Sequence, residues 1–400
     1  AIAGLPGSQA IGHVRYSTAG SSAIRNCQPF AVDYAGGILA IAHNGTLTNA
    51  DELKHDLEDR GSLFTSTSDS EIFLHLLAKN RDGSLEDRLR QVASEVRGAY
   101  TLVVMTGNEI AGLRDPHGFR PLVLGRRGDA HVLSSETTAL SLIGAEFVRD
   151  VEPGEVVVID ASGVRSSRIA PIGHPVRQCV FEHVYFARPD SRVFGRSVYQ
   201  TRKELGRILA EESPPPGGAD LVIPVPDSGT TAALGFAEQM RIPFELGLIR
   251  SHYVGRTFIE PVQSIRNFGV RLKLAAVEAQ IRGRRVVVVD DSLVRGTTGK
   301  KIIQLLRAAG ATEVHMRIAC PPTVSPCYFG IDTPTVDELI AANQSVEAIG
   351  AHLGADTLAY LSLEGLHRAV ADRAGNNPER RFCNACFTRD YPVPPPASAA

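Results

Sequence analysis

Residues Val286 to Gly299 read VVVVDDSLVRGTTG, and this stretch decides the fold of the half of the chain that contains it. The β-branched run Val286–Val289 predicts a strand buried on both faces, as in a parallel sheet with helices on each side. Apolar residues at helical spacing then predict a helix over Lys300–Ala309, which Gly310 ends. Ligands of such sheets bind beyond the carboxyl ends of the strands. We therefore expect a binding site where this strand meets this helix.

The junction between strand and helix carries two adjacent carboxylates, Asp290 and Asp291, followed by a loop of glycine and threonine residues. Carboxylates accept hydrogen bonds from ribose hydroxyls and bind Mg²⁺, while amides at a helix N-terminus bind phosphate. The alternative is a solvated Asp-Asp turn, but such a turn does not require the RGTTG loop. The loop is not a Walker A motif, because GxxxxGK[ST] is absent from it. The pattern favours a ribose phosphate ligand.

Length and composition exclude several classes of protein. A chain of 400 residues can form two domains. Its net charge of -2 argues against binding to nucleic acid. No apolar run approaches the roughly 20 residues that span a bilayer, no secretory signal opens the chain, and its cysteines are too few for a disulfide scaffold. We expect a cytoplasmic enzyme that binds neither membrane nor nucleic acid.

The first half of the sequence has many short strand-like runs and few helical ones, which predicts an α+β sandwich flanked by helices. Helices are expected near Asp51–Glu58 and Leu85–Val96. Prolines and a glycine place a domain boundary near Ala170–Arg177. Beyond it, a helix near Tyr199–Glu212 precedes a second strand-loop-helix unit, in which LVIPVP leads to Asp227–Thr230. The second half is therefore expected to be an α/β domain.

The motif VVVVDDSLVRGTTG resembles the phosphoribosyl diphosphate (PRPP) motif of type I phosphoribosyltransferases. With VPDSGTTAALGFAE and YVGRTFIEP, the chain resembles the glutamine phosphoribosylpyrophosphate amidotransferase family from Gly12 to about Tyr391. The resemblance implies a partial N-terminal-nucleophile glutaminase sandwich over 1–171, a type I phosphoribosyltransferase parallel-sheet domain with a C-terminal metal-binding segment over 172–391, and a disordered tail over 392–400. The implied activity (EC 2.4.2.14) opens purine biosynthesis by converting PRPP and glutamine, or ammonia, to 5-phosphoribosylamine, glutamate and pyrophosphate.

The resemblance assigns glutamine-binding roles in the first half. Arg15 in GHVRYST would bind the glutamine α-carboxylate, and Asp69 in STSDSE would hold its α-amino group. Asn44 and Gly45 in AHNGTL would form the oxyanion hole, a role for which an amide side chain and a backbone N–H are suited. Alone, Asn44-Gly45 is a common turn dipeptide and Asp69 an ordinary helix N-cap. Their order and spacing together favour the family roles.

The family nucleophile is a Cys at the mature N-terminus, whose α-amino group can act as base. Residue 1 of this sequence is Ala, and Cys27 in RNCQPF does not match the nucleophile position. We expect Cys27 to be a buried apolar residue instead. The sequence is therefore interpreted as a glutaminase domain without its first part. As a whole polypeptide it would not hydrolyse glutamine, whereas a longer protein that includes the nucleophile would.

For PRPP, the resemblance implies contacts from both α/β units and from a loop between them. Ser228 would join Asp290 and Asp291 at Mg²⁺, although Ser228 alone could be a simple helix cap. Arg256 lies in the loop that in the family folds over PRPP and completes an ammonia channel. Arg271 and Lys273 would meet the diphosphate or, alternatively, form the solvated face of a helix. The implied PRPP-binding residues are Asp290, Asp291, Arg295, Gly296, Thr297, Thr298, Gly299, Arg256 and Lys273.

Four of the six cysteines match the ligands of the iron-sulfur form of the family: Cys179, Cys327, Cys383 and Cys386. Four thiolates are the usual ligands of a [4Fe-4S] cluster. A four-cysteine zinc site is the alternative, and an exposed CxxC with scattered buried thiols is the reading without metal. Cys320 has no assigned role.

The family resemblance also implies purine nucleotides as feedback inhibitors and a homotetramer. Two other functions stay open on the sequence: an ammonia-dependent phosphoribosyltransferase without glutaminase activity, and a non-catalytic protein that senses nucleotides. Pyrophosphate release from PRPP and ammonia distinguishes the enzymes from the sensor.

Overall fold

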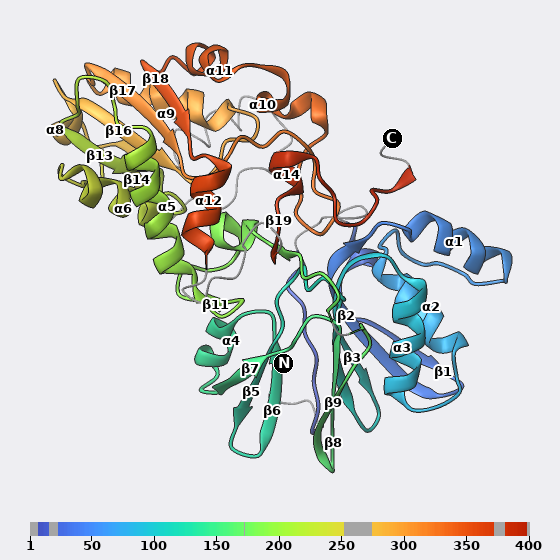
Figure 1. The fold of residues 1–400 in the computed structure, drawn as a ribbon. Helices are drawn as coiled ribbons and strands as arrows, with labels where there is room; N and C mark the ends of the chain where they lie inside the picture. The colour runs from blue at the N-terminus through green and yellow to red at the C-terminus, as the bar shows by residue number, and fades with distance from the viewer. Residues whose placement is uncertain (1–6, 16–22, 172, 252–273, 372–380, 398–400) are drawn as a thin grey trace.

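The computed structural model describes residues 7–15, 23–171, 173–251, 274–371 and 381–397. Figure 1 shows an antiparallel first half, from blue to green, below a parallel second half, from light green to red. The predicted combination of an α+β half and an α/β half is confirmed. No helix within the described ranges combines the length and apolar character needed to cross a bilayer.

The first half is built on a six-stranded antiparallel sheet in the order β1-β2-β3-β4-β8-β9. The longest strand, β2, pairs with β1 over Gly37–Ile41. On its other side it pairs with β3 over Leu39–Leu47, which extends six residues further. The last residues of β2 therefore lie at an edge that β1 does not cover. The strands are β1 (Phe30–Tyr34), β2 (Gly37–Leu47), β3 (Gly98–Thr106), β4 (Ile110–Arg114), β8 (Glu155–Asp160) and β9 (Gly163–Arg168).

Both faces of this sheet are covered. The helices α1 (Ala50–Asp59), α2 (Ser70–Lys79) and α3 (Leu85–Glu95) supply apolar side chains such as Leu57, Phe73 and Leu89 to one core. A three-stranded sheet packs across the other face, where Leu122 and Val151 meet Val157 of β8. Its order is β6-β5-β7, from β5 (Val123–Arg127), β6 (Ala130–Ser134) and β7 (Glu146–Asp150), with α4 (Thr137–Leu142) beside it.

The second half contains a four-stranded parallel sheet in the order β13-β16-β17-β18. Val286–Val289 of β16 are fully buried, as predicted for a strand with helices on both sides. In Figure 1, α5 and α6 lie on one side of the sheet and α9 with α11 on the other. The elements are β13 (Leu221–Pro224), β16 (Arg285–Asp290), β17 (Glu313–Ile318), β18 (Thr357–Tyr360), α5 (Val198–Glu212), α6 (Thr230–Met240), α9 (Thr297–Ala308), α11 (Val346–Leu353) and α12 (Leu363–Val370).

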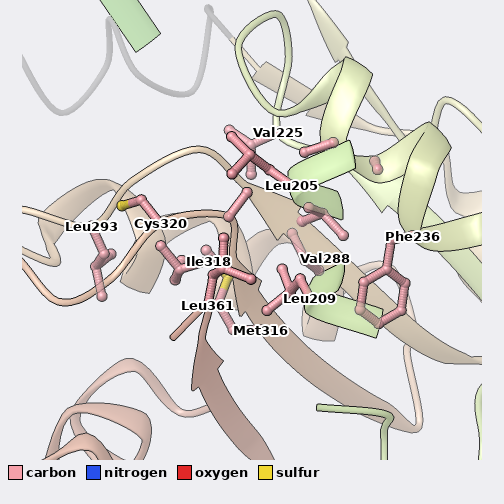
Figure 2. Packing of buried hydrophobic residues seen from close by; sticks show 14 of the residues in the cluster. Leu205, Leu209, Val225, Phe236, Val288, Leu293, Met316, Ile318, Cys320 and Leu361 are labelled. Carbon is pink, nitrogen blue, oxygen red and sulfur yellow. The ribbon is translucent and has the colours of Figure 1, made fainter. Parts of the chain in front are cut away.

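Figure 2 shows how the core of this half is filled. Leu205 and Leu209 of α5 and Phe236 of α6 converge on Val288 of β16 and Met316 of β17. Glycines bring α5 and α6 unusually close, since a Cβ on Gly206 would lie 1.8 Å from the Ala232 carbonyl oxygen. This close packing fixes the sheet whose carboxyl edge carries the predicted ligand site.

Short elements complete the described chain. The C-terminal segment returns to the body through β19 (Phe382–Cys383), which pairs in parallel with β10 (Gln178–Cys179) so that Cys179 faces Cys383. The others are β11 (Arg192–Val193), β12 (Arg196–Ser197), β14 (Leu248–Arg250), β15 (Leu274–Ala276), α8 (Glu278–Ile281), α10 (Ile340–Asn343), α14 (Ala385–Thr388), the 3-10 helices η2 (Ile24–Asn26) and η5 (Val336–Glu338), and the π-helical turn η3 (Glu182–Phe186).

The tail predicted to be disordered over 392–400 has defined positions as far as Ala397. Tyr391 and Val393 pack against a small buried cluster that contains Phe119 and Phe329. Packing of the apolar Val393 side chain against this cluster is consistent with the defined position of the segment. Residues 398–400 lie outside the described residues.

Candidate functional site

The free edge of β2 presents backbone amides in an alternating pattern. Thr48 donates its N–H to the Arg97 carbonyl on the β3 side, at 2.8 Å. His43 and Leu47 instead donate their N–H groups to side chains on the other side, to Gln28 Oε1 at 2.7 Å and to Asp69 Oδ2 at 2.9 Å. Because N–H directions alternate along a strand, the Gly45 N–H points toward this same edge. The predicted oxyanion donor thus lies between two amides that side chains already bind.

Asp69 and Arg15 approach the same edge from different segments. Asp69 occupies the position before α2, but its carboxylate makes no capping bond to the helix and binds the Leu47 amide instead. The interpretation of Asp69 as an ordinary N-cap is therefore wrong. Arg15 is half-buried beside His13, whose Nε2 donates to the His43 carbonyl at 3.1 Å. Asn44, Gly45 and Asp69 thus lie around the end of β2, and Arg15 is two residues after His13, which contacts this strand.

A buried polar network beneath this edge was not found from the sequence. His43 Nδ1 and Gln28 Nε2 both contact the Ser70 hydroxyl, at 2.9 and 3.1 Å, and His43 Nε2 lies 3.3 Å from the Ala99 carbonyl. Burial lowers the pKa of His43, although the nearby Asp69 carboxylate opposes this effect. A neutral His43 fixes the strand directly before Asn44. The HNG tripeptide was the available signal, but it does not say which way the histidine points.

The second candidate site lies at the carboxyl end of β16. Asp290 and Asp291 are 8% and 6% exposed, and the Asp291 amide donates to Asp290 Oδ1 at 2.9 Å. Burial, and then the neighbouring Asp291 charge, raise the pKa of Asp290 well above its ordinary value. A solvated Asp-Asp turn would not be buried in this way, so that alternative is wrong. Two buried carboxylates are costly without a counter-charge, and hard cations such as Mg²⁺ take such oxygen ligands.

The loop after β13 rests directly on these carboxylates. A Cβ on Gly229 would lie 2.3 Å from the Val289 carbonyl oxygen and 3.2 Å from Asp290 Cα, so only glycine allows this approach. Gly229, and not Ser228, occupies the cap position of α6, and it makes no side-chain cap bond. The alternative role of Ser228 as a helix cap is therefore wrong. The loop instead brings half-buried Ser228 to the strand end that carries Asp290.

The RGTTG loop forms the N-terminus of α9. Gly296 has φ +75° at the cap position, and Thr297 and Thr298 are exposed in the first helical turn. This helix begins three residues before the predicted start because the threonines join its first turn. Arg295 is exposed, and Glu338 holds its guanidinium at 3.1 and 3.3 Å. Gly299 is buried within the helix, while Arg256, Arg271 and Lys273 lie outside the described residues.

A third site is an enclosed cavity lined by the four predicted cysteine ligands. Cys179 and Cys383 come from the β10-β19 pair, Cys386 from α14, and Cys327 from the loop after β17. The cavity has a volume of about 30 Å³ and is otherwise mostly apolar, with Phe119, Phe181, Phe329 and Ile331 in its wall. Burial raises the pKa of the Cys179 thiol to about 12 and that of the Cys383 and Cys386 thiols well above the ordinary value. The CxxC is not exposed, which contradicts one part of the reading without metal.

The four cysteines line the wall of a cavity and do not converge on a single atom position. Within the described ranges, no three Cys, His, Asp or Glu side chains gather closely enough to hold a single metal ion. A four-cysteine zinc site would bring its sulfurs to one ion at about 2.3 Å each. The Thr323 hydroxyl also lines the cavity, and it is buried without a hydrogen-bond partner in the described structure. The four thiols and this unpaired hydroxyl are the polar groups that residues of this cavity could offer to a bound metal centre.

A buried ion pair joins the two halves beside this cavity. Arg120, fully buried, extends from the first half and lies 3.0 Å from Glu182 of η3. Its guanidinium also stacks over Phe186, 4.3 Å from the ring centroid. The Arg120 charge lowers the pKa of Cys179 against the opposing effect of burial. Sequence reasoning missed this residue because a single arginine in GFRP carries no local signal of burial.

The remaining two cysteines lie elsewhere. Cys27 is exposed, so the prediction that it is buried was wrong. It directly follows η2, a short turn whose only buried residue is Asn26. Cys320 is fully buried after β17 and donates to the Pro321 carbonyl at 3.3 Å. Neither residue lines the cysteine cavity.

Comparisons with known families agree with the two halves. Residues 13–142 match the family described as glutamine amidotransferase domain. Residues 197–324 match the family described as phosphoribosyl transferase domain. The first match covers the β2 edge, and the second covers the carboxylate pair and the start of α9.

Relatives match along nearly the whole chain. The chloroplastic amidophosphoribosyltransferase 2 of Arabidopsis thaliana is 53% identical over 98% of this chain and 68% of its own length. The amidophosphoribosyltransferase of Bacillus subtilis is 48% identical over 97% of this chain and 81% of its own length. A structure of the B. subtilis glutamine PRPP amidotransferase complexed with ADP and GMP has a TM-score of 0.88 and 46% identity, covering 96% of this chain and 82% of that chain. This identity, over both domains and with a shared fold, shows that the chain belongs to the amidophosphoribosyltransferases, the enzymes of the first step of purine biosynthesis.

Proposed function

We propose that the two half-reactions of this amidophosphoribosyltransferase take place at the two protein sites described above. Glutamine is hydrolysed at the edge of β2 when the family's N-terminal Cys nucleophile, which these 400 residues do not contain, is supplied by the protein. The ammonia reacts with PRPP at the carboxyl end of β16. The observation that carries this division is the arrangement of the His43, Gly45 and Leu47 amides on one edge. Within the described residues, side chains bind the amides of His43 and Leu47, and the Gly45 amide lies between them. That arrangement is suited to an oxyanion, because a preorganised donor stabilises developing charge without reorganising.

In the glutamine half-reaction, Arg15 binds the α-carboxylate of the substrate and Asp69 its α-amino group. Asp69 uses Oδ2 for the Leu47 amide, so Oδ1 remains to accept from the substrate ammonium. The side-chain amide of Asn44 and the N–H of Gly45 donate to the oxygen that becomes negative when a nucleophile attacks the amide carbon. His43, held by Ser70, keeps this part of β2 in place.

In the synthase half-reaction, ammonia attacks C1 of PRPP and pyrophosphate departs. The amides and hydroxyls at Gly296–Thr298 bind the 5-phosphate, since a helix N-terminus favours an anion. Asp290, Asp291 and Ser228 would hold Mg²⁺, which supplies charge neutralisation for the leaving diphosphate when bound. Arg256, in the loop expected to fold over PRPP, and Lys273, expected with Arg271 to meet the diphosphate, are assigned to PRPP from the family resemblance alone. Arg295 is assigned with them, and PRPP binding would then have to displace Glu338 from its guanidinium.

We assign the cysteine cavity to a [4Fe-4S] cluster held by Cys179, Cys327, Cys383 and Cys386, with zinc as the weaker alternative. The four thiols that line one cavity support a bound metal centre, and the family resemblance favours the cluster. When bound, the cluster supplies a structural crosslink of the C-terminal segment to β10 and the loop after β17. The cluster is not proposed to transfer electrons during turnover.

Regulation is proposed by analogy with a relative. Because the B. subtilis structure is complexed with ADP and GMP, we propose that purine nucleotides inhibit this enzyme at or near the PRPP site. We further propose a homotetramer, which light scattering of the full chain would test.

Separate assays of the two nitrogen donors test the proposed division. Asn44→Ala should lower phosphoribosylamine formation from glutamine by about 100-fold, as expected for loss of one oxyanion donor, and leave formation from ammonium unchanged. An equal loss with both donors would show that Asn44 does not act in glutamine hydrolysis. Pyrophosphate release without any effect of glutamine would favour the ammonia-dependent enzyme instead.

A further inference from the structure

A glycine from the phosphoribosyltransferase half packs directly on the backbone of Gly45. Gly330 is buried with φ +102°, and a Cβ placed on it would lie 2.9 Å from Gly45 Cα, 3.2 Å from Gly45 C and 3.5 Å from Gly45 N. Real Cβ atoms essentially never approach within 3.0 Å of another heavy atom. The contact therefore admits no side chain without moving the backbone that carries the proposed oxyanion donor.

The loop that carries Gly330 is held rigidly on both sides of the contact. Phe329 stacks on Phe119 of the glutaminase half, with ring centroids 4.4 Å apart and an interplanar angle of 14°. The Phe329 amide donates to Cys327 Sγ at 3.3 Å, and the Cys327 amide donates to Thr333 Oγ1 at 2.6 Å. These interactions fix the position of Gly330 relative to Gly45 from across the domain boundary.

The opposite side of Gly45 is equally constrained. A Cβ on Gly45 itself would lie 2.1 Å from the Ala99 carbonyl oxygen, the same carbonyl that His43 Nε2 approaches at 3.3 Å. Ala99 belongs to the buried cluster that contains Phe119 and Phe329. Gly45 is thus clamped between β3 and the Gly330 loop, which leaves its N–H little freedom to tilt.

We propose that Gly330 is a positioning residue of the oxyanion hole, supplied to the glutaminase site by the phosphoribosyltransferase half. This inference rests on the proposed role of Asn44 and Gly45 in glutamine hydrolysis. A clamp made from the other domain means that glutamine is hydrolysed at full rate only when the two halves are packed together. The ammonium reaction does not use Gly45 and is independent of the clamp.

The test compares three variants with both nitrogen donors, each made in a protein that carries the family's N-terminal Cys nucleophile, because these 400 residues do not contain it. Gly330→Ala adds the clashing Cβ. Gly283→Ala is the matched control, because Gly283 also has a positive φ, +73°, in the same half, yet a Cβ there would meet nothing within 4 Å. Phe119→Leu weakens the stack that holds the loop without adding a clash, and it serves if Gly330→Ala does not fold. Ammonium-supported activity in each preparation reports whether the synthase half is intact.

We expect Gly330→Ala to lower glutamine-supported kcat by about 100-fold, the loss typical of a misplaced oxyanion donor, with a nearly unchanged KM for glutamine. Ammonium-supported kcat of Gly330→Ala should equal that of Gly283→Ala. Because Phe119 also lines the cysteine cavity, Phe119→Leu is judged by the ratio of glutamine- to ammonium-supported kcat, which should fall by less than in Gly330→Ala. Equal glutamine-supported kcat for Gly330→Ala and Gly283→Ala would overturn the inference, as would a loss confined to KM. If Asn44→Ala also left glutamine turnover unchanged, the proposed oxyanion role itself would be wrong, which is a separable outcome.

Discussion

The Asp69 carboxylate accepts a hydrogen bond from the Leu47 amide at 2.9 Å, although Asp69 stands where an ordinary helix cap would be expected. The bond ties the start of α2 to the end of β2 and orients one carboxylate oxygen away from the protein amide. An α-amino group of glutamine bound at this edge would meet that oxygen as a charge-assisted hydrogen bond.

Asp69→Asn separates the charge of this residue from its structural bond. The asparagine oxygen can still accept from Leu47, but the neutral amide no longer attracts the ammonium of glutamine. A hydrogen bond to a charged group contributes about 1.5–3 kcal/mol, so the KM for glutamine should rise by about 10- to 100-fold. Steady-state kinetics with ammonium should be unaffected. Asp87→Asn, in the exposed capping box of α3, is the control and should change neither KM.

Asp290→Asn should impair the reaction with both nitrogen donors. Loss of one carboxylate from a buried metal-binding pair weakens both PRPP binding and the stabilisation of the departing diphosphate, which predicts a fall in kcat/KM for PRPP of about 100-fold or more. Asp220→Asn is a suitable control, because Asp220 lies before the amino end of β13 and pairs with Arg285 at 3.0 Å. Calorimetry of Mg²⁺ and PRPP binding to each variant would check the cause. Normal turnover by Asp290→Asn would show that the Asp290 carboxylate is not part of the PRPP site.

The cysteine cavity predicts iron and sulfide in the native protein. Anaerobic purification should give iron and inorganic sulfide in equal amounts, with little zinc, and Cys386→Ser should lose both. Cys27→Ser changes an exposed cysteine away from the cavity and should keep both. Zinc at one ion per chain, lost in Cys386→Ser, would show that the cavity collapses around a single metal ion.

His183 should make the protein sensitive to acid. Burial lowers its pKa to about 3, and both ring nitrogens lack partners within the described structure. Below the unfolded-state pKa of about 6.5, the unfolded chain binds a proton that the folded chain does not, so stability is lost as pH falls. Urea unfolding between pH 7 and pH 5 should show a loss of up to about 1.4 kcal/mol per pH unit that is absent in His183→Leu. Parallel pH profiles for the two proteins would contradict this assignment.

Local patterns in the sequence predicted the strand-loop-helix units of the second half that contain β13 and β16, but not β17, β18, α11 or α12. The valine run gave β16 within one residue at each end, because a strand buried on both faces leaves an uninterrupted apolar signal. The start of α9 was placed too late, since threonines are weak helix formers and only the positive φ of Gly296 shows that they belong to the first turn. The acidic pair and the RGTTG loop could be identified as a site because their functional side chains lie next to one another in the sequence.

Contacts between distant segments could not be predicted in this way. Gly330 and Gly45 are far apart in the chain, and neither sequence context indicates that their backbones touch. The cavity brings Cys179 to Cys383 through a two-residue strand pair that is too short to leave a periodic signal. The four cysteine ligands were identified from the family resemblance. The Arg120–Glu182 pair and the Thr323 hydroxyl beside them could be identified only from the folded structure.

The most direct test of a two-site enzyme is the ratio of glutamine-supported to ammonium-supported phosphoribosylamine formation, measured for the native enzyme, Asn44→Ala and Asp291→Asn. We predict that Asn44→Ala lowers this ratio by about 100-fold, whereas Asp291→Asn lowers both rates and leaves the ratio unchanged. A ratio that Asn44→Ala does not change, or that Asp291→Asn shifts strongly, would contradict the assignment of glutamine hydrolysis to β2 and PRPP chemistry to β16.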